Sequence, residues 1–141
     1  MSFLPNDTAG LVRWWMRGIA AFYLSVLVAS CPPIVERLFP LVYPHLELPR
    51  GAPITEALAD AWFLLALGLG VLGGRLLQAS REPLAHLPLV RLVVAWEIVV
   101  GIAGGAYFLA RGHVDPLVTT ALTVPSVVIV GSGRYLLGRT R

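Results

Sequence analysis

The chain has 141 residues, of which 57% are apolar and 13% are charged, with a net charge of +3 and a single cysteine. A soluble domain carries about 25% charged residues, so this composition indicates one integral membrane domain instead. The lone cysteine excludes an intrachain disulfide, and no Cys/His cluster has metal-ligand spacing. In a membrane chain, the positive charge indicates contact with lipid headgroups rather than with nucleic acid.

The first predicted span covers residues 11–31. Two arginines and two tryptophans within residues 13–17 are typical of an anchor at the membrane interface. The span ends in VASC at residues 28–31, which also resembles the cleavage site of a lipoprotein signal peptide. We expect the segment to be retained as a span and Cys31 to be a structural thiol.

The only long connection is the loop 32–55, whose first 22 residues hold six of the eleven prolines. An apolar face within residues 34–42 predicts a short amphipathic helix that either lies along the interface or caps the ends of the spans. A functional loop and a rigid lid are both compatible with this pattern.

Three further spans are predicted at residues 57–77, 89–110 and 117–137. The third span rises roughly 33 Å as a helix, which is enough to cross a hydrocarbon core of about 30 Å. Asp115 and Pro116 have the order of an N-cap and a first helical residue, and Pro125 predicts a bend in the last span. The predicted fold is all-α, with four transmembrane helices in an antiparallel bundle.

The distribution of arginines predicts the orientation of this bundle. With both termini in the cytoplasm, the cytoplasmic side carries eight arginines and the opposite side carries three. Positive residues concentrate on the cytoplasmic side of membrane proteins, so both termini are predicted to be cytoplasmic. The eight are Arg13, Arg17, Arg75, Arg81, Arg91, Arg134, Arg139 and Arg141, and the three are Arg37, Arg50 and Arg111.

Glu97 is the one carboxylate inside the third span. An ionised side chain facing lipid costs at least a few kcal/mol, so Glu97 should face the other helices. Arg17, Arg75 and Arg134 are its candidate ion-pair or hydrogen-bond partners, and Arg17 is closest in depth. Such a pair would fix helix rotation, whereas a proton-relay or ligand-binding carboxylate and a protonated, buried Glu97 are the alternatives.

Small residues mark two helix-packing motifs. The second span carries GxxxG at Gly70 and Gly74, and the third carries it at Gly101 and Gly105. Glycines at this spacing let helix backbones approach closely, so we expect tight packing between the second and third spans. Within the third span, α-helical geometry places Glu97, Gly101, Gly104 and Phe108 on one face.

The other polar residues give weaker signals. At the non-cytoplasmic end, Asp60 is expected either to face Arg111 or Arg50 or to be solvated. The three histidines, His45, His86 and His113, fall in loops, and the hydroxyls of Tyr23 and Tyr107 need partners that the sequence does not identify. No phosphate-binding loop, nucleophile elbow or HExxH motif occurs, so an enzyme is not favoured, and neither a metal nor a cofactor is expected.

The pattern LVRLVVAWEIVVGI, followed by AYFLARGH and a final apolar span, resembles the small four-span BphX-like and DoxX-like membrane proteins. The resemblance covers residues 57–137 and places Glu97, Arg111 and Gly112 at the family's Glu and Arg-Gly positions. The Pro-rich loop has no counterpart in this pattern. The resemblance implies a four-helix bundle rather than a particular activity.

Together these features predict a multi-pass protein of a bacterial inner membrane, in contact with lipids and with other subunits or a second copy. The abundance of arginine over lysine and the excess of small apolar residues favour a bacterial source. The favoured function is an accessory or structural subunit of a larger membrane assembly. The alternative is a protein that binds a lipid, a quinone or another small hydrophobic molecule in a pocket around Glu97.

Overall fold

The computed structural model describes residues 8–112 and 114–140, and every regular element in these ranges is helical. The elements are α1 (Thr8–Ala29), α2 (Pro32–Val42), α3 (Pro53–Ala79), α4 (Leu87–Trp96), η1 (Glu97–Ala103), α5 (Gly104–Arg111) and α6 (Pro116–Arg139). Because α4, η1 and α5 follow one another without a break, they form one rod. This rod, α1, α3 and α6 are each long and apolar enough to cross a membrane, which confirms the all-helical class and the four candidate spans.

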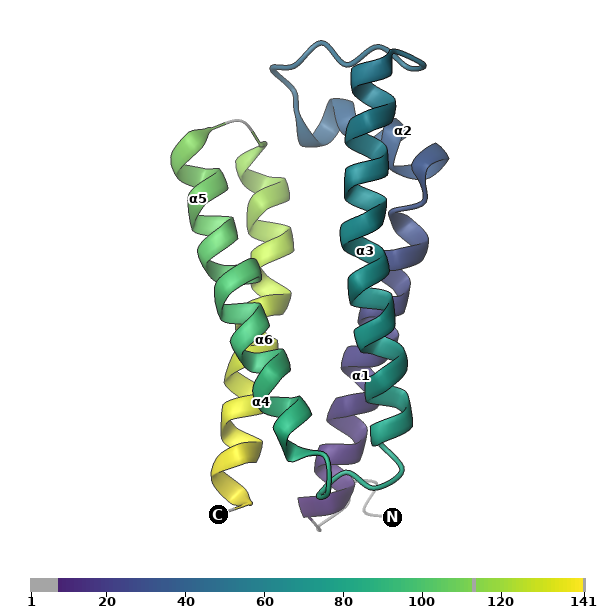
Figure 1. The fold of residues 1–141 in the computed structure, drawn as a ribbon. Helices are drawn as coiled ribbons and strands as arrows, with labels where there is room; N and C mark the ends of the chain where they lie inside the picture. The colour runs from purple at the N-terminus through teal and green to yellow at the C-terminus, as the bar shows by residue number, and fades with distance from the viewer. Residues whose placement is uncertain (1–7, 113, 141) are drawn as a thin grey trace, which may run out of the picture.

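The four long helices are arranged as two pairs (Figure 1). Helix α1 packs along α3, and α6 packs along the rod formed by α4, η1 and α5. The start of α1 and the end of α6 lie at the same end of the molecule, whereas α2 lies at the other end. We call these the terminal end and the α2 end.

The expected packing between the second and third spans is wrong, because α3 and α4 approach each other only sparsely and α3 packs on α1. The glycines show the reason. A Cβ placed at Gly70 would meet Leu27 of α1, and one at Gly73 would meet the Ala20 carbonyl oxygen. The close-approach face of α3 is therefore turned toward the first span and not toward the third.

The main core lies toward the terminal end and joins all four long helices. Its α1 stripe is spaced by four, four and three residues, which keeps the side chains on one helix face. The buried members are Val12, Met16, Ala20, Tyr23, Leu76, Ala79, Val90, Val93, Ile129 and Leu136.

The segment predicted as a Pro-rich connection contains helix α2. Prolines stand in its first turn, where a missing backbone N–H costs little, and the helix continues through Pro40. Val35 and Phe39 of α2 and the following Tyr43 pack against Ala59 of α3 and Val114. Helix α2 therefore packs against the ends of the long helices, as one of the two expected arrangements requires.

The start of α6 follows the sequence closely. Asp115 is its N-cap, and its side chain accepts hydrogen bonds from the backbone N–H groups of Leu117 (2.8 Å) and Val118 (3.3 Å). The backbone N–H of Asp115 in turn donates to the carbonyl oxygen of Val42, at 3.0 Å, and so ties this turn to the end of α2. The predicted N-cap is confirmed, and α6 runs from Pro116 through Pro125 to Arg139.

Candidate functional site

The middle of the third span is a π-helical segment that begins at Glu97. A π-helix has more residues per turn than an α-helix, and such wide turns occur frequently at functional sites. Gly105 shares the inward face with Gly101, as the GxxxG spacing predicts, whereas Gly104 does not. A Cβ at Gly101 would overlap Ser126 of α6 and one at Gly105 would overlap Thr123, whereas one at Gly104 meets no described atom within 4 Å. The expected face through Gly104 is therefore wrong.

The carboxylate of Glu97 is buried against Tyr23 of α1. The Tyr23 hydroxyl donates a hydrogen bond to Glu97 Oε1, and the two side chains are only 1% and 5% exposed. Burying polar groups without partners is unfavourable, so this hydrogen bond offsets part of the desolvation of both groups. It also joins the two helix pairs, because Tyr23 belongs to one pair and Glu97 to the other.

The partner of Glu97 differs from the arginine expected from the sequence. Arg17 Nε donates instead to Ser80 Oγ at 3.3 Å, Arg75 Nη1 donates to Gln78 Oε1 at 3.2 Å, and Arg134 is exposed. Arg17 and Tyr23 are six residues apart on α1, so the tyrosine lies roughly 9 Å further along the helix. The residue of α1 that lies at the depth of Glu97 is therefore Tyr23 and not Arg17.

Around this pair lies a cavity of about 430 Å³ between the two helix pairs. Its volume falls within the range of small-molecule binding sites. Most of the wall is apolar and includes Trp62 and Leu65 of α3, Trp96 of α4 and Leu122 of α6. Toward the α2 end, Tyr43 and Val114 complete the wall, so the cap formed with α2 covers this end of the cavity.

The cavity wall carries both hydrogen-bond acceptors and hydroxyl groups that can donate, among them Ser30, Tyr43 and Ser126. Thr119 and Thr123 of α6 donate their hydroxyl hydrogens to backbone carbonyl oxygens one turn earlier, at 3.1 and 2.8 Å, so only their lone pairs remain for the cavity. Tyr23 gives its hydrogen to one oxygen of Glu97 and leaves the second, Oε2, as a further acceptor. None of the described residues that line the cavity is basic. Glu97 Oε2 and the lone pairs of the two threonines can therefore accept a hydrogen bond from an O–H or N–H group of an apolar molecule.

The remaining predicted residues lie away from this cavity. Asp60 is exposed on α3, while the Arg111 guanidinium lies over the ring of Tyr107, with 5.9 Å from Cζ to the ring centroid. Gly74 faces open space among the described residues, unlike Gly70. His113 lies outside the described residues.

Sequence reasoning missed Tyr23 as the partner of Glu97 and the hydroxyl face of α6. Thr119, Thr123 and Ser126 are spaced by four and three residues, so they share one face of that helix. A run of small hydroxyl residues on one face of an apolar span was the available signal for a polar wall. The partner of Glu97 had no comparable signal, because it depends on how α1 is rotated and on its depth relative to the third span.

The fold and this site define a multi-pass helical membrane protein with a half-open cavity between its two helix pairs, into which the Tyr23–Glu97 pair is set. The family model described as BphX-like matches residues 10–139, so the chain belongs to the BphX-like family, which confirms that part of the resemblance. Proteins named as uncharacterized BphX-like proteins in Burkholderia cepacia and in Paraburkholderia xenovorans (strain LB400) are each 36% identical over 90 residues. Those residues are 64% of this chain and 65% of the length of each relative. No solved structure matches the chain significantly.

Proposed function

We propose that this chain binds a small, mainly apolar molecule in the cavity and holds that molecule's O–H or N–H group on Glu97 Oε2. The observation that carries the proposal is the buried Tyr23–Glu97 pair, which orients a carboxylate toward an apolar space of about 430 Å³. A polar side chain inside a membrane is unfavourable, and such residues commonly mark functional sites. A quinol, a phenol or a lipid alcohol has the required chemistry.

The proposed setting is the inner membrane of a bacterium, with the terminal end in the cytoplasm and the four spans antiparallel. Seven described arginines lie toward the terminal end and three lie toward the α2 end, and an excess of positive residues favours the cytoplasmic side. Arg141, which sequence analysis assigned to the same side, lies outside the described residues. In this orientation the cavity extends from the middle of the membrane toward the non-cytoplasmic side, where the cap formed by α2 covers it.

The test compares two probes that differ only in the donor, 4-hexylphenol and its methyl ether. Each is titrated into the detergent-solubilised full chain, and binding is followed by the fluorescence of Trp62 and Trp96, which both line the cavity. We expect the phenol to bind at least tenfold more tightly than the ether, because the ether leaves the Glu97 acceptor without a donor. In Glu97→Leu this preference should disappear.

The matched control is Asp60→Asn, which neutralises an exposed acid on α3 that does not line the cavity. This variant should keep the full preference for the phenol. Equal binding of the two probes by the unaltered chain would contradict the proposal. An identical loss in Asp60→Asn and Glu97→Leu would contradict it as well, because the effect would then not depend on the cavity carboxylate.

An accessory subunit of a larger membrane assembly is the second candidate. Gly131 and Gly138 of α6, seven residues apart, face open space among the described residues, on a helix that also exposes Val127 and Val128. Exposed small residues on an apolar helix let a neighbouring helix approach closely. Gentle extraction followed by native mass measurement should then give larger chains in a fixed ratio, and Gly131→Leu should release them. A lone protomer in both preparations would contradict this candidate.

A further inference from the structure

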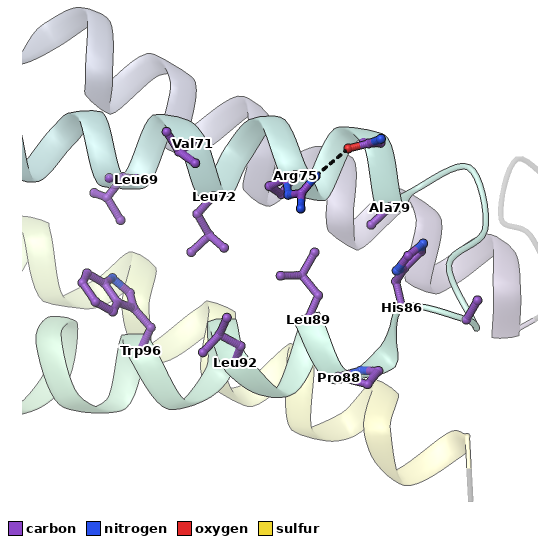
Figure 2. Close-up of a pocket in the computed structure, with 13 residues that line it drawn as sticks. Leu69, Val71, Leu72, Arg75, Ala79, His86, Pro88, Leu89, Leu92 and Trp96 are labelled. Atoms are coloured by element: carbon purple, nitrogen blue, oxygen red, sulfur yellow. Dashed lines mark hydrogen bonds between the residues drawn. The ribbon is translucent and has the colours of Figure 1, made fainter.

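A second hollow, adjacent to the cavity, opens between α3 and α4 toward the terminal end (Figure 2). It is a groove of about 820 Å³, and it lies where α3 and α4 approach each other only sparsely. Thirteen described residues of α3, of α4 and of the turn between them form its walls. The proposed function does not use this groove.

The two ends of the groove differ in chemistry. Figure 2 shows Arg75 of α3 and His86, just before α4, toward one end, and Leu69 and Trp96 toward the other, with leucine side chains in between. The Arg75 guanidinium is exposed and bonded on one side to Gln78. None of the thirteen lining residues is acidic. The groove therefore joins a cationic mouth to an apolar channel.

The length and position of the groove fit a phospholipid. Ten residues separate His86 from Trp96, so the apolar channel is roughly 15 Å long, which is about half of a hydrocarbon core. Arg75 lies one turn before the end of α3 at Ala79, which is the depth at which the headgroups of one leaflet meet a span. Basic pockets between transmembrane helices are known to bind anionic headgroups.

We propose that the groove between α3 and α4 binds one anionic glycerophospholipid, with the phosphate on Arg75 and His86 and one acyl chain lying along Leu72, Leu89 and Leu92 toward Trp96. Charge complementarity selects the anionic lipid, because the mouth offers a guanidinium and an imidazole without a lining acid. The acyl chain fills the apolar space that the sparse α3–α4 packing leaves. The proposal does not rest on the ligand of the Glu97 cavity, although Leu69 and Trp96 line both hollows.

The experiment measures quenching of Trp96 by phospholipids with brominated acyl chains in mixed micelles of the full chain. Phosphatidylglycerol and phosphatidylcholine with identical chains are compared, and the Trp96→Phe variant is subtracted to isolate the Trp96 signal. We expect half-maximal quenching at about fivefold less phosphatidylglycerol than phosphatidylcholine, the factor expected for one arginine near an anionic headgroup. Arg75→Gln should remove this preference.

Arg134→Gln is the matched control, because Arg134 is an exposed arginine about one turn before the end of α6 and does not line the groove. It should leave the fivefold preference intact. Gly68→Leu, at a wall position that faces open space among the described residues, should narrow the channel and weaken quenching by both lipids. Equal quenching by the two lipids in the unaltered chain would overturn the proposal. So would an equal effect of Arg75→Gln and Arg134→Gln, or full quenching in Gly68→Leu.

Discussion

The cavity and the groove lie between the same helix pairs but have opposite polar chemistry. The cavity contains a carboxylate and several hydroxyls, and the groove contains a guanidinium and an imidazole. Leu69 and Trp96 line both hollows and separate them. The cavity is closed at one end by the packing of α2, whereas the groove lies along a side where α3 and α4 barely meet.

This difference teaches that a hollow can be built into a helical protein in two ways. In the cavity, small residues hold α6 close to the third span, so the polar atoms there are fixed by tight packing and by bonds to the helix backbone. In the groove, the polar side chains stand near helix ends and extend from exposed positions. Changes at the cavity should therefore alter stability, and changes at the groove should alter mainly what binds.

The largest effect is expected from Gly101→Ala in the cavity wall. Its methyl group would overlap Ser126 and Glu97, and such overpacking costs about 1 to 3 kcal/mol. Gly68→Ala, in the groove wall, adds a methyl group where no described atom lies within 4 Å and should change stability by less than about 0.5 kcal/mol. The free energy of unfolding, measured by circular dichroism in an SDS titration, distinguishes the two. If Gly101→Ala and Gly68→Ala lowered the free energy of unfolding by similar amounts, the proposed difference in packing between the cavity and the groove would be wrong.

Tyr23→Phe should lower the free energy of unfolding by about 1 to 2 kcal/mol, because it removes the hydroxyl and leaves the buried Glu97 carboxylate without its partner. Tyr107→Phe provides the comparison, since that side chain is 58% exposed on α5. The same SDS titration should show no more than a few tenths of a kcal/mol for this control. Two equal values would mean that the Tyr23–Glu97 bond does not stabilise the chain.

The N-cap residues of α6 and α4 should differ in how much they stabilise their helices. Asp115→Ala, at the α2 end, removes the cap of α6 and should cost about 1 kcal/mol. His86 occupies the same position at the start of α4 but makes no capping bond among the described residues, so His86→Ala should have little effect. Hydrogen exchange of the first turn of each helix would localise the difference. A larger increase in exchange at the start of α4 in His86→Ala than at the start of α6 in Asp115→Ala would contradict this expectation.

The smallest effect on stability is expected from Arg75→Gln. The arginine is exposed and its bond to Gln78 lies on the surface, where such contacts contribute less than about 1 kcal/mol. The midpoint of thermal unfolding of Arg75→Gln in detergent should match that of the unaltered chain. A large destabilisation would show that Arg75 belongs to the packed structure and not to an open groove.

Much of the fold could be predicted from the sequence, because hydropathy and turn residues are local properties. The four apolar runs became the four long helices, and the order of Asp115 and Pro116 marked the start of α6. Which spans pack together could not be predicted, because a GxxxG motif indicates close approach without naming the neighbour. Thus Gly70 faces α1, while Gly101 faces α6.

The candidate site was predicted only in part. Glu97 stood out because it is a carboxylate in an apolar run, and its burial between helices agrees with the cost of exposing it to lipid. Tyr23 did not stand out, because a tyrosine is common in apolar spans and its contact depends on the relative depth of two distant helices. The π-helical segment at Glu97 had no sequence marker at all.

That segment also sets the angular phase of the third span. An α-helix turns by 100° per residue, so accommodating one extra residue in a wide turn rotates everything beyond it by about 100° relative to an unbroken α-helix. Val94 of α4 lies against Gly133 of α6, and Gly105 of α5 lies against Thr123 of the same helix. The wide turn thus changes which sequence positions face α6 between the first and the second half of the rod.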